Sequence, residues 1–343
     1  MADISKLVRE NVRNLTPYSS ARDEFGGKEG IFMDANENPY GSLNRYPDPY
    51  QRELKAAISR IKGVPEENIF LGNGSDEIID LCFRIFCNPG SDKALTFTPT
   101  YGMYEVAASI NDVTLIKIPL SDEFQIDGKS VQGKLKDPAL KLIFICSPNN
   151  PTGNSMPRFE IESIISGFKG IVVIDEAYID FSGQPSFKTM INRYSNLIVM
   201  QTFSKAMGLA AARVGMAFMD ASAVGYFNKM KPPYNISSIN QKAALESLAR
   251  IDLQKKRIRR IITERERIAG SLKKMSIIEK IFPSDSNFLL VKTKNADLIY
   301  AELIDNKIIV RNRNKIVPGC IRITVGTKRE NDKLLGTLRR IRL

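Results

Sequence analysis

The sequence predicts an α/β protein with a mostly parallel central sheet flanked by helices, followed by a smaller α+β domain. From about residue 50, short apolar runs typical of buried strands alternate with helical segments. This alternation indicates parallel strands whose connecting helices cover both faces of one sheet. After Pro232 and Pro233 the pattern changes to a long helical stretch followed by separate strands, which predicts a second, smaller domain.

The first 45 residues are expected to form an arm. A short amphipathic helix comes first, and an irregular stretch rich in Gly, Asn and Pro follows it. In the large domain we expect helices at 52–63 and 77–87, and strands at 68–72, 94–98, 114–118, 141–146, 171–175 and 197–200.

The smaller domain is expected to begin with one long helix over about 238–271. Strand candidates follow at 287–291, 308–311 and 321–325, and a basic helix ends the chain. We therefore divide the chain into an N-terminal arm (1–45), a large domain (46–236) and a small C-terminal domain (237–343).

The composition excludes much chemistry, because the 343 residues include no His and no Trp. A Ser-His-Asp triad, a Cys-His pair and a His-ligated zinc ion are all impossible, and we expect no metal site. If the protein is an enzyme, its acid–base work falls to Lys, Asp, Glu, Tyr or Cys side chains, or to a cofactor.

The formal net charge of +12 suggests anionic partners, either small phosphorylated metabolites or nucleic acid, although it can equally serve solubility. The most basic run, 255–267, has isoleucines near helical spacing and two interrupting glutamates. This pattern favours the solvated face of an amphipathic helix over a nucleic-acid patch.

The location is expected to be cytoplasmic. Four cysteines without a CxxC pair (Cys82, Cys87, Cys146 and Cys320) are typical of reduced core residues. The N-terminus does not resemble a secretory signal, and no apolar run has the length of a membrane span.

Three segments at predicted strand ends carry candidate chemistry, since open α/β sheets bind ligands there. In the first, Gly72 and Gly74 give a flexible turn, with Ser75 and Asp76 at a helix start. Such a turn offers free N–H groups to an anion such as phosphate, although the same residues also serve as ordinary helix caps.

In the second segment, a buried strand delivers Asp175 at its end and Tyr178 three residues later. A buried carboxylate needs a cation or a hydrogen-bond donor, so Asp175 is either a ligand or a loop cap. The third segment places Thr202, Ser204 and Lys205 after a strand, then a helical AMGLAAA run and Arg213. Burial among small and apolar residues would lower the pKa of Lys205 and make its amine nucleophilic.

Together the three segments are the parts of a pyridoxal phosphate site. Such a site needs a phosphate-binding turn, an acid that pairs with the pyridine nitrogen, a lysine that holds the cofactor as a Schiff base, and an arginine for the phosphate. This cofactor also explains how a chain without His could perform demanding acid–base chemistry.

The sequence resembles the fold-type I pyridoxal-phosphate aminotransferases over nearly its whole length, and within them the histidinol-phosphate aminotransferases. SPNNPTG (147–153), DEAY (175–178) and the SKxxGLxxxR pattern (204–213), in this order and spacing, are very specific for the superfamily. The narrower branch is indicated by NLTPYSSAR (14–22) and by the C-terminal pair Arg311 and Arg322. Ala211, Ala212 and Met216 depart from the usual pattern without removing a catalytic group.

The resemblance implies a role for each matching residue. The catalytic residues would be Lys205, Asp175 and Tyr178. The cofactor would also contact Gly74, Ser75, Asp76, Tyr101, Asn150, Thr202, Ser204, Arg213 and, from a partner chain, Tyr46. The substrate would contact Tyr18, Asn36, Arg311 and Arg322.

The resemblance also implies a homodimer with shared active sites, in which the arm packs with the small domain and the partner chain. The implied reaction is ping-pong transamination of histidinol phosphate with 2-oxoglutarate in histidine biosynthesis. Alternatives are an aromatic amino acid aminotransferase or a phospho-amino-acid decarboxylase of the same fold and, from another class, a non-enzymatic basic protein that binds nucleic acid. Neither a nucleic acid nor a membrane is expected as a partner of the enzyme.

Overall fold

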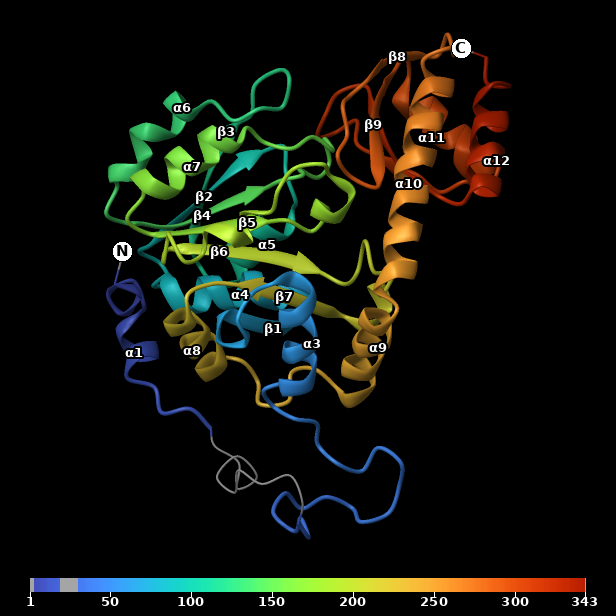
Figure 1. Cartoon of the computed structure of the whole chain (residues 1–343). Helices are drawn as coiled ribbons and strands as arrows, with labels where there is room; N and C mark the ends of the chain where they lie inside the picture. Colours follow the sequence, from blue (N-terminus) through green and yellow to red (C-terminus); the bar gives the residue numbers. More distant parts are fainter. Residues whose placement is uncertain (1–2, 19–29, 343) are drawn as a thin grey trace.

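The computed structural model describes residues 3–18 and 30–342, and it confirms the predicted α/β architecture. A seven-stranded sheet forms the centre of the large domain, and a four-stranded sheet forms the small domain (Figure 1). The part of the predicted arm at 19–29, which includes the end of the NLTPYSSAR segment, lies outside the described residues.

The large sheet has the strand order β1-β7-β6-β5-β4-β2-β3. Its strands are β1 (Ile69–Asn73), β2 (Lys93–Thr98), β3 (Thr114–Pro119), β4 (Leu140–Cys146), β5 (Ile171–Asp175), β6 (Leu197–Thr202) and β7 (Val214–Phe218). All neighbours pair in parallel except β7, which is antiparallel to both β1 and β6. The strands β1, β4, β5 and β6 therefore end at the same edge of the sheet.

Helices cover both faces of this sheet, as expected. The helices of the arm and the large domain are α1 (Glu10–Arg13), α3 (Arg52–Lys62), α4 (Gly74–Phe86), α5 (Met103–Ile110), α6 (Gly128–Gln132), α7 (Arg158–Gly167) and α8 (Ala221–Met230). Those further along the chain are α9 (Ser238–Ala249), α10 (Ile251–Leu272), α11 (Ala296–Asp305) and α12 (Lys328–Leu338). None of the helices in the described ranges is long and apolar enough to cross a membrane.

The alternation of side chains along each strand divides the core into two layers. In β4, Ile143 and Ile145 pack in one layer with α3, α7 and α9, while Leu142 and Phe144 pack in the other with α4, α5 and α8. The four cysteines are buried and free, which confirms their prediction as core residues.

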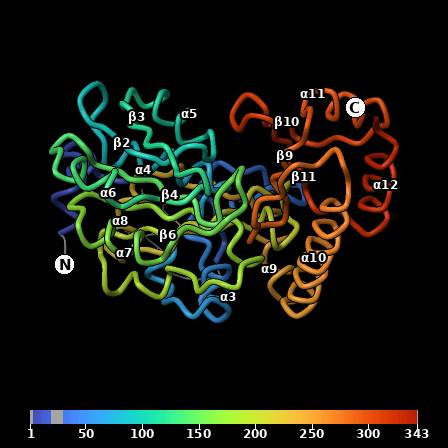
Figure 2. Tube along the Cα trace, turned by 90° about the horizontal axis from the view of Figure 1, so that it is seen from above, coloured from blue at the N-terminus to red at the C-terminus, as the bar shows by residue number. Residues whose placement is uncertain are grey.

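The small domain contains β8 (Ile278–Ile281), β9 (Phe288–Thr293), β10 (Arg311–Asn312) and β11 (Cys320–Thr324). Its sheet is entirely antiparallel, with the order β10-β11-β9-β8. α10, α11 and α12 pack against it around the buried side chains of Ile268, Ile299 and Leu335. Figure 2 shows this domain beside the large one, with α9 and α10 at the junction.

The structure corrects several expected elements. The single helix over 238–271 is two helices, because the chain leaves helical backbone at Arg250 (φ −108°, ψ 33°). The strand expected at 308–311 is reduced to Arg311–Asn312, while β7 and β8 were not expected. The AMGLAAA run forms turns and one 3-10 turn (Ala210–Ala212), since Gly208 adopts a positive φ of +69°.

The packing also bears on the division into domains, which stays a prediction. Ala244 and Leu248 of α9 lie in the core of the large domain, so a boundary after α9 describes the packing better than one at residue 237. At the start of the arm, Ile4, Val8 and Val12 pack in the large-domain layer that contains α4 and α8. The expected packing of the arm with the small domain and the partner chain stays a prediction.

Candidate active site

A cavity of about 620 Å³ lies at the sheet edge where β1, β4, β5 and β6 end, and both domains line it. The structure brings together most of the residues that the sequence singled out. Those lining the cavity are Ser75, Asp76, Tyr101, Asn150, Asp175, Tyr178, Thr202, Ser204, Lys205, Arg213, Arg311 and Arg322.

The N-terminus of α4 forms one wall of the cavity. Gly74 begins the helix with a φ of +75°, and a side chain there would collide with the guanidinium of Arg213. A Cβ on Gly215 of β7 would lie 2.5 Å from the carbonyl carbon of Gly74. Because the first N–H groups of a helix lack partners within it, this crowded glycine turn leaves donors and a positive dipole end for an anion.

Asp76 orients two other side chains of this wall. Its carboxylate accepts hydrogen bonds from the Tyr101 hydroxyl and from Nη2 of Arg213, both at 3.0 Å. An ionised carboxylate has no proton to donate to a phosphate oxygen. Asp76 is therefore suited to bind an anion through its backbone N–H, while its carboxylate holds Arg213 in place.

Thr202 and Ser204 belong to the same wall, at the end of β6. The Thr202 hydroxyl accepts a hydrogen bond from the Ser204 N–H at 3.1 Å. This contact shapes the turn that leads to Lys205, while the Ser204 hydroxyl stays half-buried at the cavity.

Asp175 ends β5 beneath the cavity and is only 3% exposed. Its carboxylate accepts hydrogen bonds from the Tyr104 hydroxyl at 2.7 Å and from the Ala177 N–H at 3.0 Å. Burial raises the pKa of the Asp175 carboxyl, although these two donors oppose the shift. The carboxylate forms no ion pair with any described residue, so a bound cation would stabilise it.

Lys205 follows β6 and opens onto the cavity. Burial and the positive charge of Arg322 lower the pKa of its amine, which favours the nucleophilic, uncharged form. Its Nζ lies 5.8 Å from the centre of the Tyr178 ring. The Tyr178 hydroxyl accepts a hydrogen bond from Nδ2 of Asn150 at 3.2 Å, and burial raises its pKa.

Arginines form the wall contributed by the small domain. Arg311 and Arg322 are direct partners across the β10–β11 pair. The Arg322 guanidinium donates to Oδ1 of Asn150, and its Cζ atom lies 5.2 Å from the centre of the Phe288 ring. Burial lowers the pKa of Arg322, and the charge of Arg311 lowers it further, whereas the interaction with Tyr178 raises it. This wall thus brings concentrated positive charge to the cavity that the N-terminus of α4 also lines.

Four residues predicted for the site do not line the cavity within this chain, and one of them, Gly74, directly precedes the lining residue Ser75. Tyr18 lines a separate hollow with Tyr50 and Tyr234, and Asn36 lines another that the arm forms with the start of α9. Tyr46 stacks on Tyr234 with ring centres 4.4 Å apart. The prediction that a partner chain supplies Tyr46 therefore stays a prediction.

Two residues at the site were missed. Tyr104, in the first turn of α5, follows Tyr101 by three residues in the TYGMY segment, and its hydroxyl donates to Asp175. Arg313 lies two residues after Arg311, and strand alternation places both on one face. Both signals are visible in the sequence, but each depends on knowing which face meets the cavity.

The residues present fit pyridoxal phosphate. The crowded turn at Gly74 matches a phosphate, and the buried Asp175 matches a protonated ring nitrogen. Lys205 opens onto the same cavity with a lowered amine pKa. The arginines of the small domain add positive charge that suits a second anion beyond the cofactor's own phosphate.

Comparison with known proteins gives a consistent result. Residues 32–338 match the family model for aminotransferase class I and II. A histidinol-phosphate aminotransferase of Cytophaga hutchinsonii is 48% identical over 343 residues, covering 98% of each chain.

Solved structures match as well. A histidinol-phosphate aminotransferase from Clostridium acetobutylicum matches with a TM-score of 0.80 and 26% identity, over 87% of this chain and 90% of that one. A Sinorhizobium meliloti histidinol-phosphate aminotransferase, in complex with pyridoxal-5'-phosphate, matches with a TM-score of 0.77 and 23% identity, over 96% of both chains.

Proposed function

Because the chain belongs to the aminotransferase class I and II family, we propose that it transfers the amino group of histidinol phosphate to 2-oxoglutarate in histidine biosynthesis. It is a pyridoxal-phosphate-dependent aminotransferase, and not the nucleic-acid-binding protein considered as an alternative. The observation that carries the substrate assignment is the arginine wall that the small domain contributes to the cavity. A guanidinium fork is well suited to a phosphate, and this wall offers several.

The residues divide the work by position. The N-terminus of α4, with Arg213, would hold the cofactor phosphate, and Asp175 would keep the ring nitrogen protonated. Tyr101 would lie against the ring, while Tyr178 and Asn150 would contact its phenolic oxygen. When bound, the cofactor supplies an electron sink for the negative charge that develops at the substrate carbon.

Lys205 is the group placed to move the proton. Its Nζ would take the proton from the substrate carbon that bears the amine and later return one to the cofactor side. The lowered pKa of Lys205 supports this role, because a base must be uncharged to accept a proton. Arg311 and Arg322 would hold the phosphate of the donor, and Arg322 also the carboxylate of the acceptor.

The assembly and location are part of the proposal. We propose a homodimer in which the arm completes the partner's site. Large apolar side chains on the arm, such as Ile31 and Met33 (92% and 90% exposed), support a protein contact there. We also propose a cytoplasmic location, which the free thiols support.

A donor screen tests the substrate. We expect the highest kcat/KM with histidinol phosphate. The kcat/KM with histidinol, which lacks the phosphate, should be lower by a factor of roughly 1,000 or more, because a site built for a polar group rejects analogues that lack that group. Glutamate formed from 2-oxoglutarate would be measured by a coupled assay. Good turnover of phenylalanine without histidinol phosphate would indicate an aromatic aminotransferase. Release of CO₂ from threonine phosphate would indicate a decarboxylase.

A further inference from the structure

We propose that Arg313 is a third substrate-binding arginine, which makes the subsite on the small domain selective for a doubly charged phosphate over a carboxylate. The inference deepens the proposed function and rests on it for the identity of the phosphate. The residues implied by family resemblance are Arg311 and Arg322, whereas Arg313 is assigned from its placement in this structure.

The backbone directs Arg313 toward the cavity. The side chain of Asn312 points the other way, where its Nδ2 donates to Asp297 of α11 at 2.7 Å. Since side chains alternate along an extended chain, Arg311 and Arg313 share the opposite face. The Arg313 N–H donates to the Cys320 carbonyl at 3.0 Å, which continues the pairing with β11 and fixes that orientation. Arg313 lines the same cavity as Arg311 and Arg322.

The three guanidiniums have no acidic counterpart of their own. None of them forms an ion pair with a carboxylate in the described part of the chain, and no carboxylate contributes to the electrostatics of Arg313 or Arg322. The Nε atoms of Arg313 and Arg322 are buried without a hydrogen-bond partner among the described residues. A buried donor that is left unpaired is costly, so an anion that accepts these hydrogen bonds would be strongly favoured.

Repulsion among the three arginines also favours an anion as the ligand. Burial and the charges of Arg322 and Arg311 lower the pKa of Arg313 to about 10. A phosphate dianion offsets this repulsion better than a carboxylate, because it carries nearly twice the charge and presents three oxygens as acceptors. A carboxylate has two oxygens, which Arg311 and Arg322 are sufficient to bind.

The test uses the holoprotein, in which the bound cofactor occupies the phosphate site at α4. Binding of methyl phosphate and of acetate would be measured by calorimetry at pH 7.5 for the wild type, Arg313→Gln and Arg313→Lys. The matched control is Arg329→Gln, which removes one charge from an exposed position on α12.

We expect Arg313→Gln to weaken methyl phosphate binding roughly 10- to 100-fold and acetate binding less than about 3-fold. Arg313→Lys should lie between, because it keeps the charge and loses the fork. Arg329→Gln should match the wild type. Methyl phosphate binding that is unchanged in Arg313→Gln, an equal loss for both ligands, or no preference for methyl phosphate in the wild type would each overturn the proposal.

Kinetics separate this proposal from the proposed function. Arg313→Gln should lower kcat/KM for histidinol phosphate by a similar factor, mainly through KM, and leave the glutamate half-reaction nearly unchanged. If the wild type does not use histidinol phosphate but the methyl phosphate result holds, the substrate assignment fails and the role of Arg313 stands. If histidinol phosphate is used and Arg313→Gln behaves as the wild type, only the role of Arg313 fails.

Discussion

At the scale of single residues, Asp175 shows how function opposes stability. The carboxylate is almost completely buried and depends on one hydroxyl and one N–H for compensation. Without the cofactor, no cation of the described chain pairs with it. Ionised Asp175 therefore destabilises the folded apoprotein, and the bound ring nitrogen would remove much of that penalty.

We predict that Asp175→Asn stabilises the apoprotein at neutral pH, by on the order of 1 kcal/mol, because the substitution replaces a buried charge with an uncharged amide of similar shape. Burial raises the pKa of Asp175, so the folded state holds this proton to higher pH than the unfolded state does. Its destabilisation is absent below the unfolded pKa and grows as pH rises through the folded pKa.

Thermal denaturation of apoprotein at pH 5 and pH 8 measures this effect. The gain in Tm for Asp175→Asn should be larger at pH 8, while transamination is lost. Asp122→Asn, at an exposed position, serves as the control and should leave Tm unchanged. A lower Tm for Asp175→Asn at pH 8 would show that the ionised carboxylate is not a source of instability.

The sequence predicts some site residues better than others. Asp175 ends a strand, and Tyr178 and Lys205 each follow a strand end by three residues in distinctive motifs. Their meeting at one sheet edge could therefore be foreseen. Arg313 could not be distinguished in a tail rich in arginine, because its role depends on the short pairing of β10 with β11. The positions of Tyr46 and Asn36 depend on where the arm lies, which local pattern does not determine.

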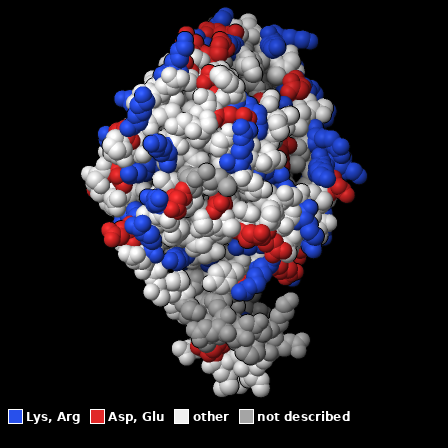
Figure 3. All heavy atoms as spheres, turned by 60° about the vertical axis from the view of Figure 1, so that its left-hand side comes forward, with Lys and Arg blue, Asp and Glu red and all other residues white. Residues whose placement is uncertain are grey.

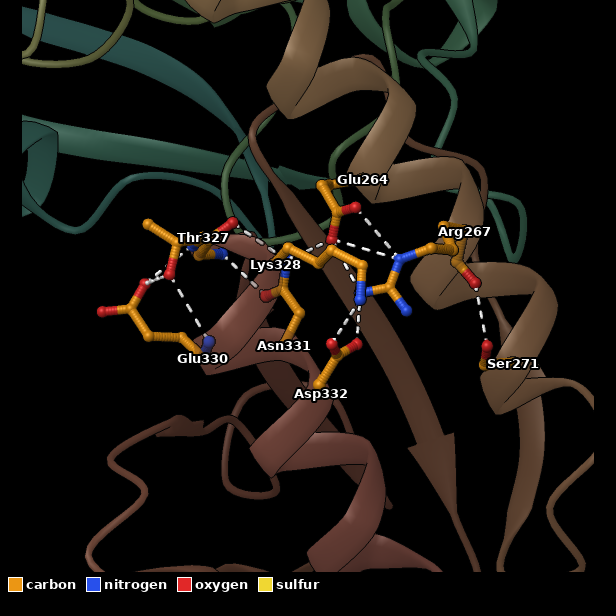
Figure 4. Close-up of polar contacts among 9 residues, drawn as sticks. Glu264, Arg267, Ser271, Thr327, Lys328, Glu330, Asn331 and Asp332 are labelled. Atoms are coloured by element: carbon orange, nitrogen blue, oxygen red, sulfur yellow. Dashed lines mark hydrogen bonds and ion pairs between the residues drawn. The ribbon is translucent and has the colours of Figure 1, made fainter.

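At the scale of elements, contacts between α10 and α12 hold the domain that carries Arg322. Figure 4 shows Glu264 and Arg267 of α10 facing Asn331 and Asp332 of α12. Arg267 bonds to both Glu264 and Asp332, at 2.8 Å each. Thr327 and Glu330 form a capping box at the start of α12, directly after β11.

Asn331 is the buried centre of this interface, at 2% exposure. Its amide nitrogen donates to Glu264 and to the Gly326 carbonyl, both at 2.9 Å, and its oxygen accepts from the Gly326 N–H at 2.9 Å. The Asn331 side chain thus supplies hydrogen-bond partners for the backbone of the loop between β11 and α12 and connects this loop to α10.

We predict that Asn331→Ala lowers the free energy of unfolding by about 2 kcal/mol, because it leaves both polar groups of Gly326 without their partner. Urea denaturation of the holoprotein, followed by circular dichroism, measures the change. Lys333→Ala, at an exposed position of the same helix, should have almost no effect. Equal midpoints for the two variants would contradict the importance of the Asn331 contacts.

The elements that the sequence did not predict share a physical cause. β7 contains Gly215, which lowers strand propensity but is required by the close approach to Gly74. The break at Arg250 is invisible in the helical periodicity, because it separates a helix that packs on the large domain from one that enters the small domain. Arg265, assigned to a solvated face, is buried and donates to the Ser286 carbonyl at 2.8 Å. Tertiary contacts decided each of these cases.

At the scale of the whole molecule, positive charge has two different uses. On the face shown in Figure 3, Lys and Arg side chains lie among Asp and Glu side chains instead of forming one continuous patch. In the cavity, Arg311, Arg313 and Arg322 are gathered without carboxylate partners among the described residues. The net charge of +12 therefore says less about ligands than the position of these three arginines.

The second part of the arm, residues 30–45, is the other feature that bears on the whole assembly, because the proposed homodimer would give it a partner. It extends away from the large domain in Figure 1 and keeps its own internal contacts, such as the ion pair between Arg45 and Glu37 at 2.6 Å. Tyr40 is 83% exposed on it. An extended arm with exposed large side chains is suited to a second copy of the chain, whose active site it would complete.

Complementation between two inactive variants tests this sharing. Lys205→Ala removes the amine from the cavity, and Tyr46→Ala removes the side chain proposed to cross to the partner. Each homodimer should be impaired at both of its sites. In a mixed dimer, one site combines the intact Lys205 of one chain with the intact Tyr46 of the other.

Random mixing should therefore restore about a quarter of the wild-type activity, since about half of the dimers are mixed and each has one complete site. Coexpression with two affinity tags allows the mixed dimer to be isolated and assayed alone, with an expected activity of about half the wild type. If Tyr46 acts within its own chain, every site in the mixed dimer carries one defect, and no activity returns.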